Sequence, residues 1–70
     1  MQISARNVIK GKIMKIVEGP VSTEVTIKVA PKVEIVSSIT STAAQTLGLK
    51  KGMEAYAVIK ATSVMVGVEH

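Results

Sequence analysis

The stretch from residue 23 to residue 30 alternates between polar and apolar side chains, and this alternation most limits how the chain can fold. The apolar positions are Val25, Ile27 and Val29, with threonine and lysine between them. A period of two residues is typical of a strand that buries one face and exposes the other. Helical burial repeats every three to four positions instead, so the chain is predicted to be built from strands.

Five stretches have the apolar content expected of strands, and turns separate them. The first two turns contain Gly-Pro at 19–20 and Pro-Lys at 31–32. The predicted strands cover residues 8–17, 23–30, 33–39, 55–60 and 64–68.

One segment between the third and fourth predicted strands reads as a helix of about two turns. Thr40 or Ser41 can cap its N-terminus by accepting a backbone N–H. Gly48 stands where a left-handed C-terminal cap is expected. Three strands, a short helix and two strands is the element order of an OB-type barrel. We therefore expect an all-β, five-stranded, OB-like Greek-key barrel with one short helix between its third and fourth strands.

The small size of the chain predicts self-association. Its 70 residues make one domain over 1–70, and a domain of this size buries only about 60% of its unfolded surface. Small domains usually need a disulfide, a metal or a partner. The chain has no cysteine, and its one histidine, His70, is terminal, which argues against a disulfide and a zinc site. Because 47% of the residues are hydrophobic, more than one small core needs, we expect a homo-oligomer.

The net charge of +4 predicts an anionic partner. Nucleic acid is one candidate, since phosphate neutralisation drives such binding. However, single-strand binders stack bases on aromatic side chains, and Tyr56 is the one aromatic residue. A small anion is the other candidate, because it needs only a few donors in one place. No signal peptide or apolar run of the roughly 20 residues that span a bilayer is visible, so we expect a cytoplasmic protein.

Catalysis has little support in the sequence. There is no cysteine nucleophile, the five glutamates are dispersed, and no glycine-rich phosphate loop is present. General acid–base chemistry needs a group of tuned pKa within hydrogen-bond reach of a substrate. We expect no enzymatic activity, no catalytic cofactor and no bare metal cation.

Ser4 and Arg6 form the first candidate donor pair. In extended backbone, residues two apart project to the same side, so a hydroxyl and a guanidinium can converge on one oxyanion. Arg6 is the only arginine, and arginine binds tetrahedral oxyanions in a bidentate way that lysine cannot match. The alternative is a surface arginine whose stem packs over a neighbour.

Two further groups of donors follow later in the chain. Lys60 ends an apolar strand, and the small residues at 61–63 (Ala-Thr-Ser) let the backbone approach a ligand; an ordinary turn is the alternative. Thr40, Ser41 and Thr42 stand at the predicted helix start, where N–H groups attract anions; simple capping is the alternative there.

The segments ISARNVIKG, SSIT, LGLKKG and VIKATSVMVG together resemble the molbindins. These are stand-alone Mop domains, which also occur in molybdate-responsive regulators and, in related form, in molybdate transporter ATPases. The resemblance covers residues 3–68. No helix-turn-helix domain precedes Ser4 and no nucleotide-binding motif is present, so we expect neither the DNA-binding regulator nor the ATPase.

The resemblance implies a hexamer, a trimer of dimers, that binds molybdate or tungstate between subunits. It implies oxyanion ligands at Ser4, Arg6, Thr40 and Lys60, with backbone assistance from Ala5 and Ala61. Relatives often have a serine ligand where this chain has Ala43. Ser41 or Thr42 would supply the substitute hydroxyl.

Molybdate suits such a set because it is a tetrahedral dianion that only accepts hydrogen bonds. Monohydrogen phosphate would bring an O–H with no acceptor, at a cost of about 1–3 kcal/mol. Sulfate has no such O–H, so only the size of the cavity can exclude it. Tungstate is nearly the same size as molybdate, so the site should discriminate poorly between these two anions. The implied function is binding and storage of molybdate or tungstate. An OB-fold nucleic-acid binder and a separate regulatory chain of a transporter or regulator are the alternatives.

Overall fold

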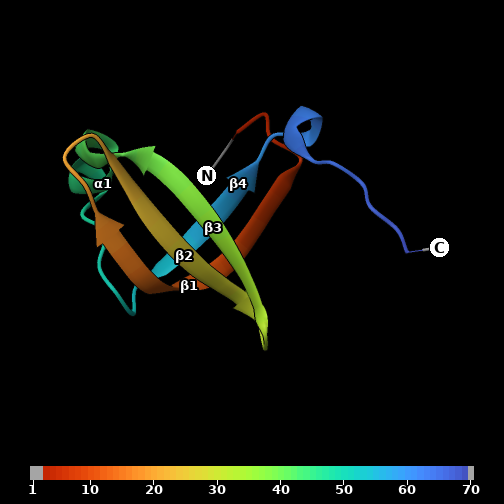
Figure 1. Cartoon of the computed structure of the whole chain (residues 1–70), viewed down its shortest axis with the longest axis horizontal. Coiled ribbons are helices and arrows are strands. Elements are labelled where there is room, and N and C mark those ends of the chain that lie inside the picture. The colour runs from red at the N-terminus through yellow and green to blue at the C-terminus, as the bar shows by residue number, and fades with distance from the viewer. Residues whose placement is uncertain (1–2, 70) are drawn as a thin grey trace.

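The sheet of this protein curls on itself and has a short helix at one end (Figure 1). The structure is a computed structural model that describes residues 3–69. Its elements are β1 (Asn7–Glu18), β2 (Ser22–Ala30), β3 (Val33–Thr40), α1 (Ser41–Leu47), β4 (Glu54–Ile59) and the 3₁₀ turn η1 (Ala61–Ser63). The antiparallel sheet has the order β3-β2-β1-β4. The terminal His70 considered above lies outside the described residues.

The long strand β1 belongs to both halves of the curl. Its residues 7–12 pair with β4, and its residues 12–18 pair with β2. Between Ile13 and Lys15 the register with β2 shifts. A bulge of this kind bends a strand and increases its twist, so β1 can pass from one half of the sheet to the other.

Gly11 lies just before this bend, where β1 passes close to β2. A Cβ at this position would lie 2.6 Å from Ile27 Cγ2 and 2.6 Å from the Lys28 carbonyl oxygen. Real Cβ atoms do not approach backbone oxygens this closely. Glycine is therefore what allows the two strands to cross at this point.

The core is small and lies inside the curl. Its buried hydrophobic residues are Ile13, Val25, Ile27 and Ala57. Partly buried residues pack around it: Ile16, Val29, Ile35, Ile39, Leu49 and Ala55. The alternation predicted for residues 23–30 is confirmed, because Val25 and Ile27 point inward while Lys28 is exposed.

The predicted helix and both of its caps are confirmed. Thr40 is the N-cap, and its Oγ1 accepts a hydrogen bond from the Ala43 N–H at 3.0 Å. Gly48 has a φ of 63°, the left-handed conformation expected at the C-terminal cap. The helix buries none of its own residues and contacts β2 and β3.

The prediction of a fifth strand at residues 64–68 is wrong for the chain on its own. After β4, the turn η1 redirects the backbone, and residues 64–69, here called the tail, leave the curled sheet without regular structure (Figure 1). Apolar side chains expected to be buried are instead exposed, Met65 by 93% and Val66 by 91%. A strand exists only where a neighbour pairs with it, and no strand among the described residues pairs with residues 64–68. The described residues thus form a four-stranded sheet and not the predicted five-stranded barrel.

Candidate functional site

One hollow gathers five of the six predicted ligand residues. We call it the donor hollow, and it is lined by Ser4, Ala5, Arg6, Val58, Lys60, Ala61 and Thr62. These residues come from two segments at opposite ends of the sequence, one before β1 and one at and after the end of β4. The fold therefore unites the Ser4–Arg6 pair with the Lys60 segment.

The pairing of β1 with β4 explains this meeting. Asn7 and Ile59 are the last partners on that side of the ladder, so Arg6 and Lys60 leave the sheet as neighbours. The Asn7 Nδ2 donates a hydrogen bond to the Ile59 carbonyl oxygen at 3.3 Å. This bond ties the two strand ends together, and Asn7 therefore positions the site without lining it.

The sequence reasoning did not assign a role to Asn7, nor did it place Val58 and Thr62 among the site residues. Asn7 had a visible signal, since it stands directly between Arg6 and the first apolar run. Thr62 lies in the donor-rich segment after Lys60 that the sequence analysis singled out. Val58 had no signal of its own, because its place on the hollow follows from the strand register.

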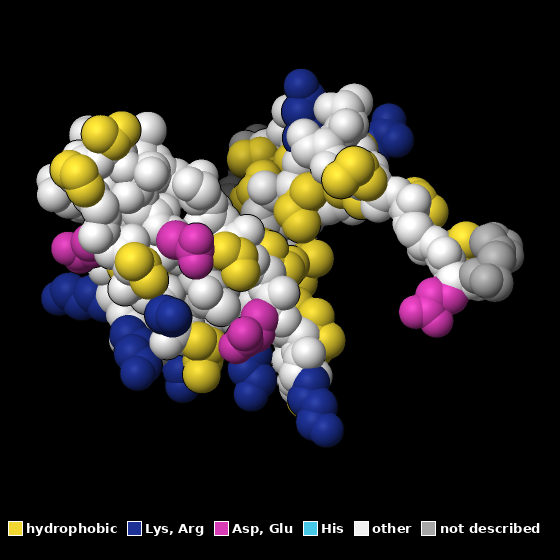
Figure 2. Space-filling view, in the orientation of Figure 1, with side chains coloured by type: hydrophobic (Ala, Val, Ile, Leu, Met, Phe, Trp, Pro, Cys, Tyr) yellow, Lys and Arg dark blue, Asp and Glu magenta, His cyan; other side chains and the backbone are white. Residues whose placement is uncertain are grey.

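The lining of the donor hollow consists of hydrogen-bond donors and apolar groups. Arg6 and Lys60 supply two positive charges, and Ser4 and Thr62 supply hydroxyls. None of the seven lining residues is acidic. Figure 2 shows Lys and Arg side chains on both sides of the lobe that contains η1. Positive groups that no lining carboxylate neutralises attract an anion that offers only acceptors.

The donor hollow is open. Ser4, Arg6, Lys60 and Ala61 are exposed, and Ala5 is half-buried. Its volume of about 590 Å³ is far more than one tetrahedral oxyanion fills. The residues of a single chain thus line the hollow without enclosing it.

Thr40, the sixth predicted ligand, lies at the other end of the molecule. It precedes α1, whereas Lys60 precedes η1, and Figure 1 shows α1 at the left of the molecule and η1 well apart from it, beyond the opposite ends of the strands. Within one chain, Thr40 therefore does not join the donor hollow. The capping hydrogen bond uses an oxygen lone pair of Thr40 and leaves its O–H for donation.

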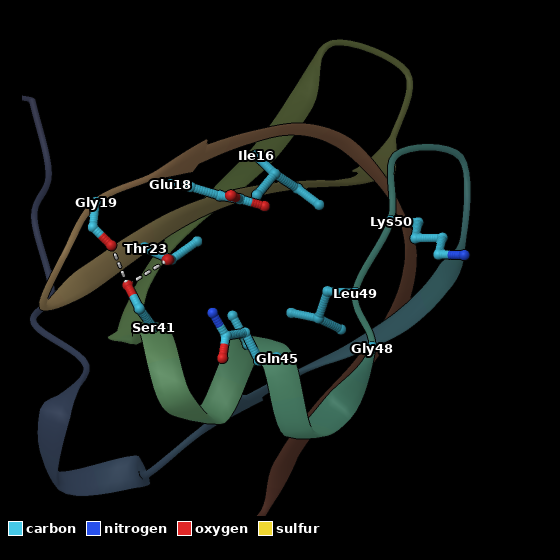
Figure 3. Close-up of a pocket in the computed structure, with 10 residues that line it drawn as sticks. Ile16, Glu18, Gly19, Thr23, Ser41, Gln45, Gly48, Leu49 and Lys50 are labelled. Atoms are coloured by element: carbon cyan, nitrogen blue, oxygen red, sulfur yellow. Dashed lines mark hydrogen bonds between the residues drawn. The ribbon is translucent and has the colours of Figure 1, made fainter.

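The two proposed substitute hydroxyls differ in what they already bind. Ser41 Oγ donates to the Gly19 carbonyl oxygen at 2.5 Å and lies 2.8 Å from the Thr23 Oγ1 (Figure 3). Because the single Ser41 hydroxyl proton goes to Gly19, Thr23 is the donor in the second bond. Thr23 is 1% exposed, so this pair satisfies a buried hydroxyl and fastens α1 to the turn before β2. Thr42, by contrast, is exposed on the first turn of α1.

A second pocket lies between α1 and the strands, and Figure 3 shows its lining. The residues around it include Glu18, Thr23, Ser41, Gln45 and Lys50. The carboxylate of Glu18 repels an anion, and the Thr23 and Ser41 hydroxyls already bind each other. This pocket is therefore a poorer oxyanion site than the donor hollow.

Other chemistry has no visible centre in the described part of the chain. Among residues 3–69, no three His, Cys, Asp or Glu side chains come together as a metal site.

Lys10 and Glu54 form an exposed ion pair on β1 and β4, with Nζ 2.8 Å from Oε2. The hydrogen bond and charge of Glu54 raise the pKa of Lys10. No helix within residues 3–69 has the length and apolar character needed to cross a bilayer.

Comparison with known proteins points to relatives that are named for molybdenum or molybdate. The TOBE domain model matches residues 3–66. A relative from Haemophilus influenzae, named "Probable molybdenum-pterin-binding protein", is 49% identical over 69 residues, which are 99% of this chain and 100% of the relative. Molybdenum-pterin-binding protein 2 of Clostridium pasteurianum is 42% identical over 66 residues, which are 94% of this chain and 97% of that protein.

Two solved structures are similar over nearly the whole chain. MopII from Clostridium pasteurianum, in an apo form, has a TM-score of 0.90 at 40% identity, covering 96% of this chain and 100% of that one. The cytoplasmic molybdate-binding protein ModG, with molybdate bound, has a TM-score of 0.92 at 43% identity and covers 99% of this chain but 49% of that one. The mostly-β, OB-like character of the fold is thereby confirmed, and so is the resemblance to Mop proteins.

Proposed function

This chain belongs to the TOBE domain family, and from that premise and the donor hollow we propose that it binds molybdate or tungstate as an intact oxyanion. The single observation behind the proposal is the composition of the hollow. Ser4, Arg6 and Lys60 meet there, and no acidic residue lines it. Molybdate accepts hydrogen bonds through all four oxygens and donates none, so it matches this lining.

The same lining favours an oxyanion over a pterin. A pterin is a flat ring system that gains affinity by stacking on aromatic surfaces. Tyr56 is the one aromatic residue of the chain, and it lines apolar grooves elsewhere on the curled sheet. The relatives are named for molybdenum and pterin together, and the donor hollow of this chain suits the molybdenum oxyanion.

We place the bound anion between copies of the chain in a homo-oligomer, with a hexamer as the expected assembly. Two features support this placement. The donor hollow is open on one side, and Thr40 lies too far from it to serve within the same chain. A Thr40 from a second copy would supply the missing hydroxyl. Backbone N–H groups of Ala5 and Ala61 would assist, and Thr42 remains the available substitute for the position occupied by Ala43.

The proposed role is reversible capture and storage in the cytoplasm, with no catalysis and no catalytic cofactor. A catalytic base or acid would need to stand beside the anion, and the lining of the donor hollow offers none. ModG is described as cytoplasmic, and the match to this chain covers 49% of the ModG chain.

Isothermal titration calorimetry of the purified protein tests the proposal. Molybdate and tungstate should both give a measurable heat of binding, with similar affinities. Phosphate at the same concentrations should give no heat of binding. Elemental analysis of protein purified without added anion should detect molybdenum or tungsten. A folded protein that gives no heat with molybdate, or that binds phosphate equally well, would disprove it.

A further inference from the structure

The outer face of the curled sheet carries a row of charged side chains that crosses all four strands. Lys12 on β1 lies opposite Lys28 on β2, and we call this pair the lysine rung. The next positions outward in the same row are Glu34 on β3 and Glu54 on β4. All four side chains are exposed, whereas the neighbouring rung of β1 and β2 is buried in the core. The row therefore faces away from the core, with two lysines at its centre and one glutamate on each side.

The two lysines of the rung repel each other. Opposite side chains of an antiparallel pair have their Cβ atoms about 4.5–5.5 Å apart, and like charges placed there destabilise the sheet. Among residues 3–69, neither lysine forms an ion pair, and Glu54, the register partner of Lys12 on β4, binds Lys10 instead. The fold thus holds two positive charges close together and leaves both of them available to a partner.

The hairpin that joins β2 to β3 holds another lysine in an unfavourable conformation. Lys32 lies at the tip of this hairpin with a φ of 62°, and within residues 3–69 it is the one non-glycine residue with a positive φ. Side chains with a Cβ atom rarely adopt this left-handed region. Figure 2 shows Lys and Arg side chains along the lower edge of the molecule as far as this hairpin. Lysines kept where pairing or backbone conformation disfavours them point to a role outside the fold.

The outer face of the sheet is too mixed in charge for a phosphate backbone or an anionic membrane. Its strands display four lysines and three glutamates, a net charge of +1: Lys10, Lys12, Lys15, Lys28, Glu24, Glu34 and Glu54. Both of those partners gain affinity from every added positive charge, and the glutamates beside the rung would repel them. A short acidic feature that reaches the rung and ends between the flanking glutamates fits this face better.

The spacing of the rung selects the form of that acidic feature. On a helix, side chains at positions i and i+4 have their Cβ atoms about 5–6 Å apart, which matches the separation of about 4.5–5.5 Å across the rung. On an extended segment, side chains of one face are two residues and about 6.6 Å apart, which is a poorer match. Two carboxylates one helical turn apart can therefore each meet one lysine of the rung.

We propose that the lysine rung docks a helix of a partner protein that carries two carboxylates one turn apart, one against Lys12 and the other against Lys28. The contact replaces the repulsion within the rung by two attractive pairs. The inference does not rest on the proposed function, because neither lysine lines the donor hollow. The rung lies at the Lys12–Glu54 end of the β1–β4 ladder, whereas the hollow lies at the Asn7–Ile59 end. A docked partner thus leaves the hollow accessible.

A titration with two model peptides tests the docking. Both are alanine-rich helical peptides with two glutamates, placed at i and i+4 in the matched peptide and at i and i+2 in the control peptide. Their net charge is the same, but the control places its carboxylates on different faces of the helix. Circular dichroism checks that both peptides are equally helical. At low ionic strength, which limits screening, the matched peptide should bind saturably and shift amide NMR signals of β1 and β2 around the rung.

Three single variants assign the binding to the rung. Lys12→Gln and Lys28→Gln should each weaken binding of the matched peptide by up to about fivefold, the size expected of one exposed charge pair. Lys60→Gln removes the same charge at the donor hollow and should leave peptide binding unchanged. Molybdate titration of these variants should give the reverse order, with a loss for Lys60→Gln only. The docking and the proposed function can therefore fail separately.

Several results would overturn the docking. They are no binding of the matched peptide, equal binding of the two peptides, and equal losses in all three variants, which would mean that net charge alone attracts the peptide. A short DNA duplex is the remaining arm of the titration. If the duplex bound more tightly than the matched peptide, the face would be a nucleic-acid surface and the proposal would be wrong.

A double-mutant cycle tests the premise that the rung is repulsive. The denaturation midpoints of wild type, Lys12→Gln, Lys28→Gln and the double variant give the coupling between the two lysines. We expect an unfavourable coupling that decreases as salt is added. A coupling that is zero or favourable would show that the lysines are not held against repulsion, and it would overturn the proposal.

Discussion

The two ends of this molecule are built in opposite ways. At the α1 end, the polar groups bind one another: Thr40 caps the helix, Gly48 closes it, and Ser41 joins Thr23 to Gly19. At the η1 end, Arg6, Lys60 and Ser4 are exposed around the donor hollow, and an apolar tail leaves the fold. An end whose hydrogen bonds are satisfied within the chain stabilises the fold. We propose that the end that exposes donors and apolar residues together is the one that meets a ligand and another copy.

Removal of the guanidinium at the η1 end is the strongest test of this contrast between the two ends. Arg6→Ala should weaken molybdate binding about 10- to 150-fold, because a hydrogen bond to a charged group contributes about 1.5–3 kcal/mol. The melting temperature without anion should stay unchanged, since Arg6 is exposed. Calorimetry and thermal unfolding measure the two effects.

Lys15→Ala is the matched control for Arg6→Ala. It removes one positive charge from an exposed position of β1, outside the donor hollow. Equal losses of affinity in the two variants would mean that net charge, and not the Arg6 fork, attracts the anion.

The α1 end should respond in the reverse manner. Ser41→Ala leaves the buried Thr23 hydroxyl without its acceptor, and a buried polar group that loses its partner costs about 1–3 kcal/mol. Chemical denaturation should detect this loss of stability, while molybdate affinity should not change. If affinity fell and stability did not, Ser41 would be a ligand after all.

The double variant Thr23→Val with Ser41→Ala sharpens the same test. Removing both partners of a buried hydrogen bond can be nearly neutral. We expect the double variant to be more stable than Ser41→Ala alone, as measured by the denaturation midpoint. Additive losses would show that the two hydroxyls do not act as a pair.

Thr40 belongs to both ends if a second copy completes the donor hollow. Thr40→Ala should cost about 1 kcal/mol through the lost cap and should also weaken molybdate binding. Thr40→Ser retains the hydroxyl and should preserve both properties. A loss of stability with full affinity would confine Thr40 to its capping role.

The smallest effect is expected at the Lys10–Glu54 pair, which belongs to neither end. Because Glu54 raises the pKa of Lys10, the pair stabilises the fold at neutral pH. This contribution is lost as the pH rises through the raised pKa. Both side chains are well exposed, so Glu54→Gln should change the melting temperature very little at pH 7. A large loss at pH 7 would contradict this account.

Local patterns were enough to predict most elements of the fold. The alternation in β2, the Gly-Pro and Pro-Lys turns, and the Thr40 and Gly48 caps all depend on neighbours within a few residues. Their physical causes, side-chain period and backbone conformational preference, act over the same short range. The predicted meeting of Ser4 and Arg6 with Lys60 depended on a family resemblance, because no local rule relates positions so distant in sequence.

The failures occurred where pairing is not local. Residues 64–68 have the sequence of a strand, yet they pair with no strand among the described residues, because pairing needs a neighbour that local sequence does not supply. The same limit hid the bond of Ser41 to Gly19 and that of Asn7 to Ile59, since each links segments that are far apart in the chain.

The sequence by itself determined that this chain makes short strands and one capped helix, that it presents hydrogen-bond donors, and that it has more apolar residues than one small core can bury. Only the tertiary structure decided which donors meet. The register of β1 against β4 places Arg6 beside Lys60, and the curl of the sheet sends Thr40 to the opposite end. The physical reason is how far along the sequence each effect acts. Backbone and side-chain preferences depend on adjacent residues, whereas strand register depends on the packing of the whole sheet.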